Sequence, residues 1–273
     1  MSRTNGKSNT PTERLEPVKT TVLHQLKVSI IATIVLAVIV SGIYPAIVWG
    51  MAQAIFPRQA NGSLIGRDGQ PVAKPEDAVG SSLIGQNFTS AKYFHPRPSS
   101  AGNGYDPTAS GGSNLGPTSA KLINGATKKD DKGNEIVDFD GVHDRIVHYC
   151  LDNNIPFTCS IPIKQFMDAQ GNLDDVKLIK AFNADNPLVV TTSREIPADA
   201  VTGSGSGLDP HISPANAELQ APRVADARKI PFEKVQEMIR RYTDQPDLGI
   251  LGNPGVNVLR LNLALDQAAP AAP

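Results

Sequence analysis

The chain has 273 residues, of which 40% are hydrophobic and 5% aromatic, and its formal net charge is -1 at pH 7. Because the charges are of mixed sign and form no basic stripe, nucleic acid is not expected as a partner. Beyond an apolar N-terminal segment, residues 58–273 are enough for one substantial domain, or for one domain that carries an insertion.

An uncharged segment follows the N-terminal tail. Its first part, residues 28–49, is almost wholly apolar, and these 22 residues would reach about 33 Å as a helix, against a hydrocarbon core about 30 Å thick. We therefore predict a transmembrane helix over residues 28–49. Pro45 lies near its far end, where a kink or an early end of the helix is tolerated.

The basic residues around this segment predict its orientation. Five Lys and Arg residues precede it, whereas few follow it directly, and cytoplasmic flanks carry the excess of these residues. We expect residues 1–27 to be a cytoplasmic tail and residues 58–273 to lie outside the cytoplasm, on a single-pass protein of the cell (inner) membrane. A cleaved signal peptide is the alternative, since Ala52-Gln53-Ala54 has the form of a cleavage site, although the apolar run exceeds the usual length of about 7 to 15 residues.

Residues 58–187 contain few regular patterns. Residues 58–118 are rich in Pro, Gly and Ser, which leaves little room for long helices, and the pairs of apolar residues within them are expected to be strands or core plugs, as at Tyr93 and Phe94. Further on, the four-residue apolar spacing after Val142 predicts one short helix, and residues 173–182 a second.

The C-terminal third carries clearer signals. Residues 188–192 are β-branched and predict a buried strand. Ser213 before Pro214 predicts the start of a helix, and an apolar stripe predicts another over residues 231–243. Leucines that alternate with other residues over 259–265 predict a half-buried strand. The predicted fold class is an α/β (or α+β) extracytoplasmic domain with one N-terminal transmembrane helix.

The chain has two cysteines, Cys150 and Cys159. In an oxidising compartment they would close a small loop by a disulfide worth about 2 to 3 kcal/mol. Two buried free thiols fit the sequence equally well, so both alternatives stay open.

The Gly- and Ser-rich residues 203–207 invite comparison with a phosphate-binding loop. They lack the spacing of a dinucleotide-binding or P-loop motif, which favours a structural turn. Asp209 and His211 follow, close to Ser206 and Ser213, but the chain has no G-x-S-x-G elbow. We assign no catalytic residue, and expect Asp209 and His211 to lock a turn or to contact a partner.

The sequence also lacks the residue patterns expected of a metal site or of a transport pathway. His143 and His148 would point about 140° apart on a helix, and the cysteines form no C-x-x-C pair, so no metal ligand and no cofactor-binding residue is assigned. One transmembrane helix cannot line a pore or build a transport site. One anchor with a non-catalytic outer domain is typical of an accessory subunit.

Several motifs, in their order along the chain, resemble the C subunit of the Kdp potassium-transporting ATPase. With the anchor, the resemblance covers residues 58–120 and 188–266. The motifs that carry it are Ser-Leu-Ile-Gly-Gln at 82–86, Tyr-Phe-His-Pro-Arg-Pro-Ser at 93–99, Tyr-Asp-Pro at 105–107, Ser-Gly-Gly-Ser-Asn-Leu-Gly-Pro-Thr at 110–118, residues 203–213, Leu-Gly-Ile-Leu-Gly at 248–252 and Val-Asn-Val-Leu at 256–259.

The resemblance implies a complex for high-affinity, ATP-driven potassium uptake. In it a channel-like subunit binds potassium, and a P-type ATPase subunit hydrolyses ATP through a phosphorylated Asp. The C subunit would be needed for assembly and would act as a catalytic chaperone that supports ATP binding or turnover. Because an outer domain cannot touch cytosolic ATP, that support would be indirect, and ATP and K⁺ would be handled by the partner subunits.

Residues 121–187 form a longer connection than the family's, so we expect an insertion there, whose cysteines and histidines inherit no role. A membrane-anchored extracytoplasmic hydrolase and a stand-alone binding or scaffold module are the alternatives. Gly42, among small residues of the anchor, is the candidate for packing against a partner helix in the lipid bilayer. The candidate interface or structural residues are Ser110, Gly111, Gly112, Ser113, Asn114, Gly203, Gly205, Gly207, Asp209 and His211.

Overall fold

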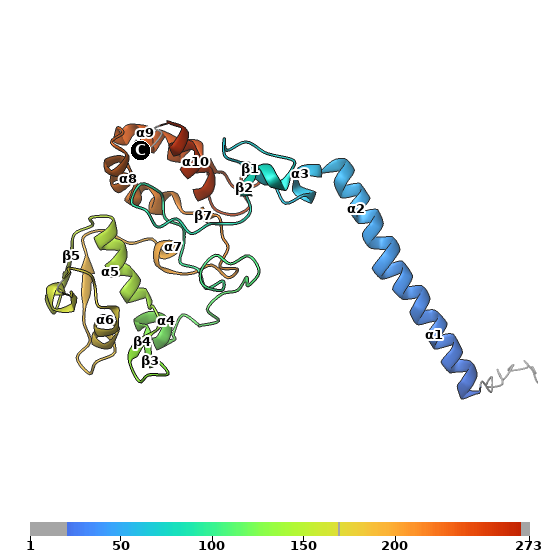
Figure 1. Ribbon diagram of the computed structural model, residues 1–273, viewed down its shortest axis with the longest axis horizontal. Coiled ribbons are helices and arrows are strands. Elements are labelled where there is room, and N and C mark those ends of the chain that lie inside the picture. The colour runs from blue at the N-terminus through green and yellow to red at the C-terminus, as the bar shows by residue number, and fades with distance from the viewer. Residues whose placement is uncertain (1–20, 169, 269–273) are drawn as a thin grey trace, which may run out of the picture. The chain divides into compact units, whose positions relative to one another are not determined.

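The structure, a computed structural model, describes residues 21–168 and 170–268, so most of the predicted cytoplasmic tail lies outside the described residues (Figure 1). The chain divides into two compact units, residues 1–60 and 61–273.

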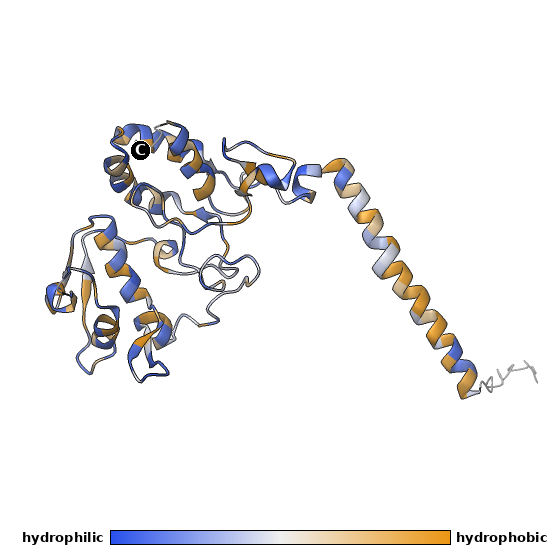
Figure 2. Cartoon of the chain, in the orientation of Figure 1, coloured by the Kyte–Doolittle hydropathy of each residue, from blue (hydrophilic) through white to orange (hydrophobic). Residues whose placement is uncertain are grey.

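The N-terminal unit is dominated by one apolar helix. It consists of α1 (Val22–Val38), a π-helical turn η1 (Ile39–Ile43) and α2 (Tyr44–Ile55), and a short helix α3 (Pro57–Ala60) follows. Across residues 22–55, all of which the structure describes, no residue is buried, and Figure 2 shows the apolar composition along the helix. By length and composition this helix of 34 residues is able to cross a membrane. It contains the predicted segment 28–49 and extends beyond it on both sides.

The π turn explains how the helix continues through Pro45. A proline has no N–H, and inside an α-helix its ring also collides with the preceding turn. The turn before it is wider here, because the N–H of Tyr44 donates to the carbonyl of Ile39, five residues earlier. The irregularity expected near Pro45 is therefore one π turn, and the helix does not end there.

The second unit contains four small sheets, and every strand pair among the described residues is antiparallel. Three sheets have two strands each: β1 (Leu64–Gly66) with β2 (Ala78–Ser81), β3 (Ala126–Lys129) with β4 (Glu135–Phe139), and β5 (Phe157–Cys159) with β6 (Val190–Thr192). The fourth has the order β7-β9-β8, with β7 (His211–Ile212), β8 (Thr243–Asp244) and β9 (Gly255–Asn257). Parallel βαβ units are thus absent from the described residues, and the α+β form of the predicted fold class is the one that applies.

Helices make up most of the remaining regular structure. They are α4 (Ala120–Asn124), α5 (Val142–Asp152), α6 (Asp175–Phe182), α7 (Ala198–Val201), α8 (Pro214–Arg228), α9 (Phe232–Arg241) and α10 (Val258–Ala268), with short 3₁₀ turns η2 (Pro75–Asp77) and η3 (Ile163–Phe166). The four helices predicted after Val142, over 173–182, at Pro214 and over 231–243 are confirmed. At the start of α8 the hydroxyl of Ser213 accepts the N–H of Asn216, as expected of an N-cap.

The predicted strand over residues 259–265 is wrong, because these residues belong to α10. Val258, Leu261 and Leu265 are buried at helical spacing, whereas Leu263 is only partly buried, so the alternating leucines do not share one face. Asn257 begins the helix, since its side-chain oxygen accepts the N–H of Arg260 at 3.1 Å. The strand predicted over 188–192 is confirmed only over β6, at residues 190–192.

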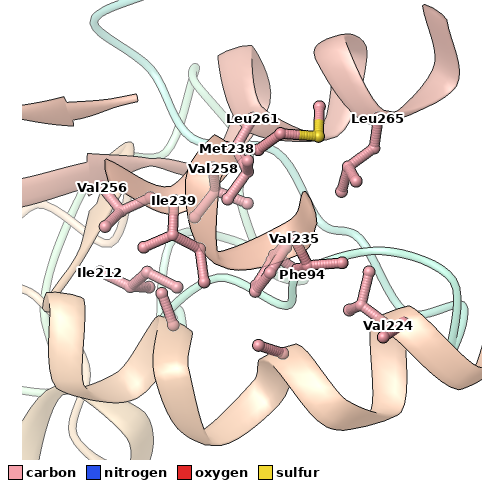
Figure 3. Packing of buried hydrophobic residues seen from close by; sticks show 13 residues of the cluster. Phe94, Ile212, Val224, Val235, Met238, Ile239, Val256, Val258, Leu261 and Leu265 are labelled. Atoms are coloured by element: carbon pink, nitrogen blue, oxygen red, sulfur yellow. The ribbon is translucent and has the colours of Figure 1, made fainter. Parts of the chain in front are cut away.

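The main core lies among α8, α9, α10 and the three-stranded sheet (Figure 3). Its small residues on α8 let the other elements approach closely, and a single aromatic ring from the loop-rich region fills the space between the helices. The buried members are Phe94, Ile212, Ala217, Ala221, Val224, Ala225, Val235, Met238, Ile239, Val256, Val258, Leu261 and Leu265.

A second, smaller core lies within the region where we expect the insertion. Val147 of α5, Phe166 of η3, Leu178 and Phe182 of α6, and Leu188 form it. The packing of α5 and α6 therefore has an apolar basis separate from the main core.

Phe94 belongs to an extended segment that pairs with no strand among the described residues. Instead, the Asn262 side chain accepts the N–H of Phe94 at 2.9 Å and donates to its carbonyl at 3.0 Å. Likewise, the Gln220 side chain accepts the N–H of His95 at 2.7 Å and donates to its carbonyl at 3.1 Å. Two carboxamides from α10 and α8 thus take the place of a neighbouring strand. Of the two alternatives for Tyr93 and Phe94, the structure has the core plug.

Arg223 of α8 completes this arrangement. It is buried and donates to the carbonyls of Ala91 and Tyr93 at 2.6 and 2.9 Å. It also donates to the side chain of Asn153, at the end of α5, at 2.9 Å. One guanidinium therefore connects the loop-rich region, the main core and α5.

The carboxamide pairing leads to the first prediction. Asn262→Leu keeps the side-chain size but leaves a buried N–H and a buried carbonyl of Phe94 without partners, which costs about 2–5 kcal/mol of unfolding free energy. Denaturant unfolding of the full chain in detergent measures this loss. Gln267→Leu changes an exposed residue of the same helix and is the matched control, expected to be nearly neutral. Equal effects of the two changes would contradict the role given to Asn262.

Candidate functional site

Two segments rich in Gly and Ser, residues 110–114 and residues 203–207, lie against each other in the structure. The N–H of Gly111 donates to the carbonyl of Ser206 at 2.8 Å, and the hydroxyl of Ser110 donates to the same carbonyl at 3.0 Å. Gly112 lies against the backbone of Gly205, since a side chain added at Gly112 would come within 3.1 Å of the Gly205 carbonyl oxygen. Of the remaining candidates in the first segment, Ser113 is half-buried, and Asn114 is exposed with a φ of 55°.

Gly207 is the closest point between these segments. Its φ is +66°, which favours glycine, and a Cβ there would lie 2.7 Å from the Gly111 carbonyl oxygen and 2.8 Å from the Ala101 nitrogen. Its carbonyl accepts the Ser99 hydroxyl at 2.6 Å. A Cβ at Gly203 would lie 3.2 Å from the Pro98 carbonyl oxygen, whereas one at Gly205 would meet open space.

Several backbone amides of these two segments donate hydrogen bonds within the protein. The N–H of Gly207 donates to the carbonyl of Ser204 at 3.2 Å, and the N–H of Leu208 donates to the Ser206 hydroxyl at 3.1 Å. Amides that cradle a phosphate must point outward and be free. The contacts accordingly favour the structural turn over an anion site.

Arg97 ties the Gly203–Asp209 segment to the motif at 93–99. Its Nη1 lies 2.9 Å from Oδ2 of Asp209, and its Nη2 donates to the carbonyls of Thr202 and Gly203 at 3.4 and 3.3 Å. The Tyr105 hydroxyl donates to the Arg97 carbonyl at 2.8 Å. Burial raises the pKa of Tyr105, and the nearby Asp209 carboxylate acts in the same direction. The pairing of Arg97 with Asp209 was not predicted from the sequence, although Arg97 belongs to the motif at 93–99.

His211 lies in a chain of charged groups. Its backbone N–H donates to Oδ1 of Asp209 at 2.9 Å, and its ring Nε2 lies 3.0 Å from Oδ2 of Asp244 on β8. Asp244 also accepts a hydrogen bond from Arg260 of α10 at 3.2 Å. These contacts join β7, β8 and α10 next to the Gly-Ser segments.

The hydroxyls required by the hydrolase alternative are used elsewhere. Ser213 donates to Asp199 at 2.8 Å while it caps α8, and Ser206 accepts the N–H of Leu208. Within the part of the chain that the structure describes, neither hydroxyl bonds to the His211 ring. The nucleophile and base of a hydrolase are therefore not brought together.

An open cavity of about 980 Å³ lies beside these residues. Asp209, His211 and Asp244 line it, together with Pro246, Asp247, Leu251 and Gly252 of the turn at residues 246–252. The turn is held by two backbone hydrogen bonds between Asp247 and Leu251, both 2.9 Å long.

The turn displays apolar side chains to solvent. Leu248 is 90% exposed, Ile250 82% and Leu251 57%. Outside helix 22–55, the first two are the most exposed large hydrophobic residues among those described. Concentrated apolar exposure of this kind is typical of a surface that another molecule covers. The sequence contained the motif but gave no sign that its side chains point outward.

The remaining candidates lie in the region of α5 and α6. His143 contacts the Phe182 ring, with centroids 5.1 Å apart, and His148 lies 2.8 Å from Asp175. Cys150 and Cys159 are free thiols, and burial raises the pKa of Cys150 to about 11. The two cysteines are thus free thiols, as in the second alternative, although only Cys150 is buried and Cys159 is half-buried.

Comparison with known proteins identifies the family. The family described as "K+-transporting ATPase, c chain" (KdpC) matches residues 26–138 and 171–267. The chain belongs to the KdpC family. Proteins of this family are accessory subunits of the Kdp P-type ATPase complex and are not enzymes by themselves, as the resemblance implied.

Several curated relatives carry the name "Potassium-transporting ATPase KdpC subunit". The one from Mycobacterium tuberculosis (strain ATCC 25618 / H37Rv) is 44% identical over 225 residues, which are 82% of this chain and 88% of the relative. The one from Gemmatimonas aurantiaca is 40% identical over 253 residues, 92% of this chain and 97% of the relative. The one from Acidobacterium capsulatum is 39% identical over 245 residues, 90% of this chain and 99% of the relative. The KdpC family match leaves out residues 139–170, a shorter stretch than the expected insertion at 121–187.

The close approach at Gly207 leads to the second prediction. Gly207→Ala places a Cβ against the Gly111 carbonyl in a backbone conformation that disfavours it, and should lower the unfolding free energy by about 1–3 kcal/mol. Gly205→Ala, two residues away and facing open space, is the control and should stay within about 0.5 kcal/mol of the parent. Urea unfolding of both variants provides the comparison. A neutral Gly207→Ala variant would refute the close contact of the two segments.

Proposed function

We propose that the unit of residues 61–268 docks on the extracytoplasmic side of the potassium-binding, channel-like subunit, with the turn 246–252 as the central contact. The exposed apolar side chains of that turn are the observation that carries the proposal. In this position the unit would brace the potassium entrance while the N-terminal helix packs against the same subunit in the bilayer.

The surroundings of the turn favour a protein partner over a lipid surface. The exposed Leu248 and Ile250 belong to the turn that contributes Pro246, Asp247, Leu251 and Gly252 to the cavity, whose lining also holds the polar side chains of Asp209, His211 and Asp244. Protein interfaces typically have an apolar centre and a polar rim.

The orientation of the helix follows from its flanks. Lys27 lies at the start of the apolar run, and basic residues are sparse after it, so the N-terminus is proposed to be cytoplasmic and the second unit extracytoplasmic. ATP binding or turnover in the P-type ATPase subunit would then be supported through the membrane region, as a coupling between distant sites. K⁺ and ATP themselves would stay with the partner subunits.

The docking surface yields the third prediction. Leu248→Asp combined with Ile250→Asp should reduce co-purification of the channel-like and ATPase subunits with the tagged chain at least tenfold. Each side chain loses apolar burial worth more than about 1.4 kcal/mol, the equivalent of a tenfold change in affinity. Potassium-dependent ATPase activity in the membranes should fall in parallel.

Val189→Asp is the matched control. It changes an exposed apolar residue that directly precedes β6 and lies outside the turn. It should leave assembly intact. Thermal unfolding of the double variant in isolation should match that of the parent, since both replaced side chains are exposed. Normal assembly of the double variant would contradict docking through this turn.

The helix yields the fourth prediction. A Cβ added at Gly42 would meet no heavy atom within 4 Å beyond the neighbouring helix backbone, so Gly42→Ile should not clash with other parts of this chain. If small residues let the helix approach its partner closely, the added side chain should weaken co-purification of the complex. Val40→Phe adds bulk on roughly the opposite side of the helix and should have little effect. Unchanged assembly and transport with Gly42→Ile would remove this face as the contact.

A further inference from the structure

A cluster of three potential metal ligands lies where α5 meets α6. Asp144 and His148 are one turn apart on α5 and share a face, and Asp175 is in the first turn of α6. One ligand atom from each residue lies within 4.8 Å of the other two. Asp144 and His148 fall outside the KdpC family match, so the family assigns them no role.

Asp144 provides an independent indication of a missing ligand. The residue is only 2% exposed, and its Oδ1 has no hydrogen-bond partner within the described residues. Such an atom carries a large desolvation cost unless something compensates it.

The arginine that follows Asp144 in the chain has other partners. Arg145 forms an ion pair with Asp140 at 2.8 Å and donates to the Val201 carbonyl at 3.2 Å. The His148 ring is then the remaining group that could offset the charge of Asp144, and this ring already lies against Asp175. The cluster therefore holds two carboxylates and one imidazole with little positive charge between them.

The cluster is open to solvent on one side. Asp144, His148 and Asp175 line a cavity of about 510 Å³, together with Asp140, Asp152 and two arginines. Both arginines, Arg97 and Arg145, are already in ion pairs, with Asp209 and Asp140 respectively. The side chains of His148 and Asp175 are partly exposed. An ion can thus reach the site without unfolding of α5 or α6, and the acidic lining favours a cation.

We propose that Asp144, His148 and Asp175 bind a divalent transition-metal ion of the Zn²⁺ type. One imidazole and two carboxylates are ligands that suit Zn²⁺ and Mn²⁺, with further positions left for water. Ca²⁺ is disfavoured because it takes about six to eight oxygen ligands. The bound ion would fasten α5 to α6 beside the second core. This inference is independent of the docking proposed above.

The geometry needs only small side-chain rotations. For ligand atoms at most 4.8 Å apart, the central point lies within about 2.8 Å of each, and Zn²⁺ binds nitrogen and oxygen at about 2.0–2.2 Å. On binding, the His148 nitrogen gives up its hydrogen bond to Asp175 and offers its lone pair to the ion.

The test uses the full chain, purified in detergent and freed of metal with a chelator that is then removed. Titration with ZnCl₂ in a calorimeter should give one ion per chain. A free concentration about 100-fold above the Kd should raise the Tm by about 5–10 °C. Asp144→Asn and His148→Gln should each weaken Zn²⁺ binding at least tenfold and abolish the shift in Tm.

Two comparisons keep the test independent of misfolding. Asp144→Asn removes an uncompensated buried charge, so the metal-free variant should melt at or above the parent's Tm. His143→Gln changes the other histidine of α5, which lies against Phe182, and should keep full Zn²⁺ binding.

Three results would overturn the proposal. They are the absence of Zn²⁺ binding by the parent chain, unchanged binding by both ligand variants, and a Co²⁺ spectrum with thiolate charge-transfer bands. The last result would place the ion on Cys150 and Cys159 instead.

Discussion

Two carboxamide side chains, Asn262 and Gln220, hold the extended segment at Phe94 and His95 against α8 and α10. A backbone buried outside a sheet must find hydrogen-bond partners, and here each carboxamide satisfies one N–H and one carbonyl. With Arg223 beside them, they fix the motif at 93–99 on the main core. Arg97 of that motif then holds the segment before Asp209, so the Gly-Ser layer depends on this pairing.

The segment around Phe94 and the turn at residues 246–252 differ in the side chains that they expose to solvent. The backbone N–H and carbonyl groups of Phe94 and His95 are all paired with side chains, which gives this segment one well-defined position. At the turn 246–252, backbone hydrogen bonds instead hold apolar side chains in solvent. A rigid turn with little conformational entropy to lose is well suited to docking, because less ordering is required on binding. This agrees with an accessory subunit of a larger complex.

How much the sequence predicted depends on the range of the interactions involved. The Ser213 cap and the apolar stripe after Pro231 are local, and they predicted α8 and α9 correctly. The leucines of 259–265 led to a wrong strand prediction, because alternating and helical spacings coincide over so short a run. The N-cap role of Asn257 was not predicted. Family motifs correctly indicated the accessory subunit.

Contacts between distant segments lay beyond the sequence. Ser110 and Ser206 are joined only by the fold, and the outward direction of Leu248 follows from the backbone of its turn. For His148, the sequence analysis compared spacing with His143, whereas the relevant neighbours are Asp144 on the same face and Asp175 on another helix. The one-turn spacing of Asp144 and His148 was visible in the sequence, but the burial of Asp144 was not.

The π turn before Pro45 also changes how the N-terminal helix presents its sides. A π turn has more residues per revolution than an α-helical turn, so each of its residues rotates the chain by a smaller angle about the helix axis. Over the five residues of η1, the side chains of α2 therefore lie about a quarter of a revolution behind the positions that a continuous α-helix would give them. A helical wheel drawn with uniform steps from α1 would therefore assign the wrong side to residues of α2. Any partner helix that follows one side of α1 meets a different set of α2 residues than the sequence periodicity indicates.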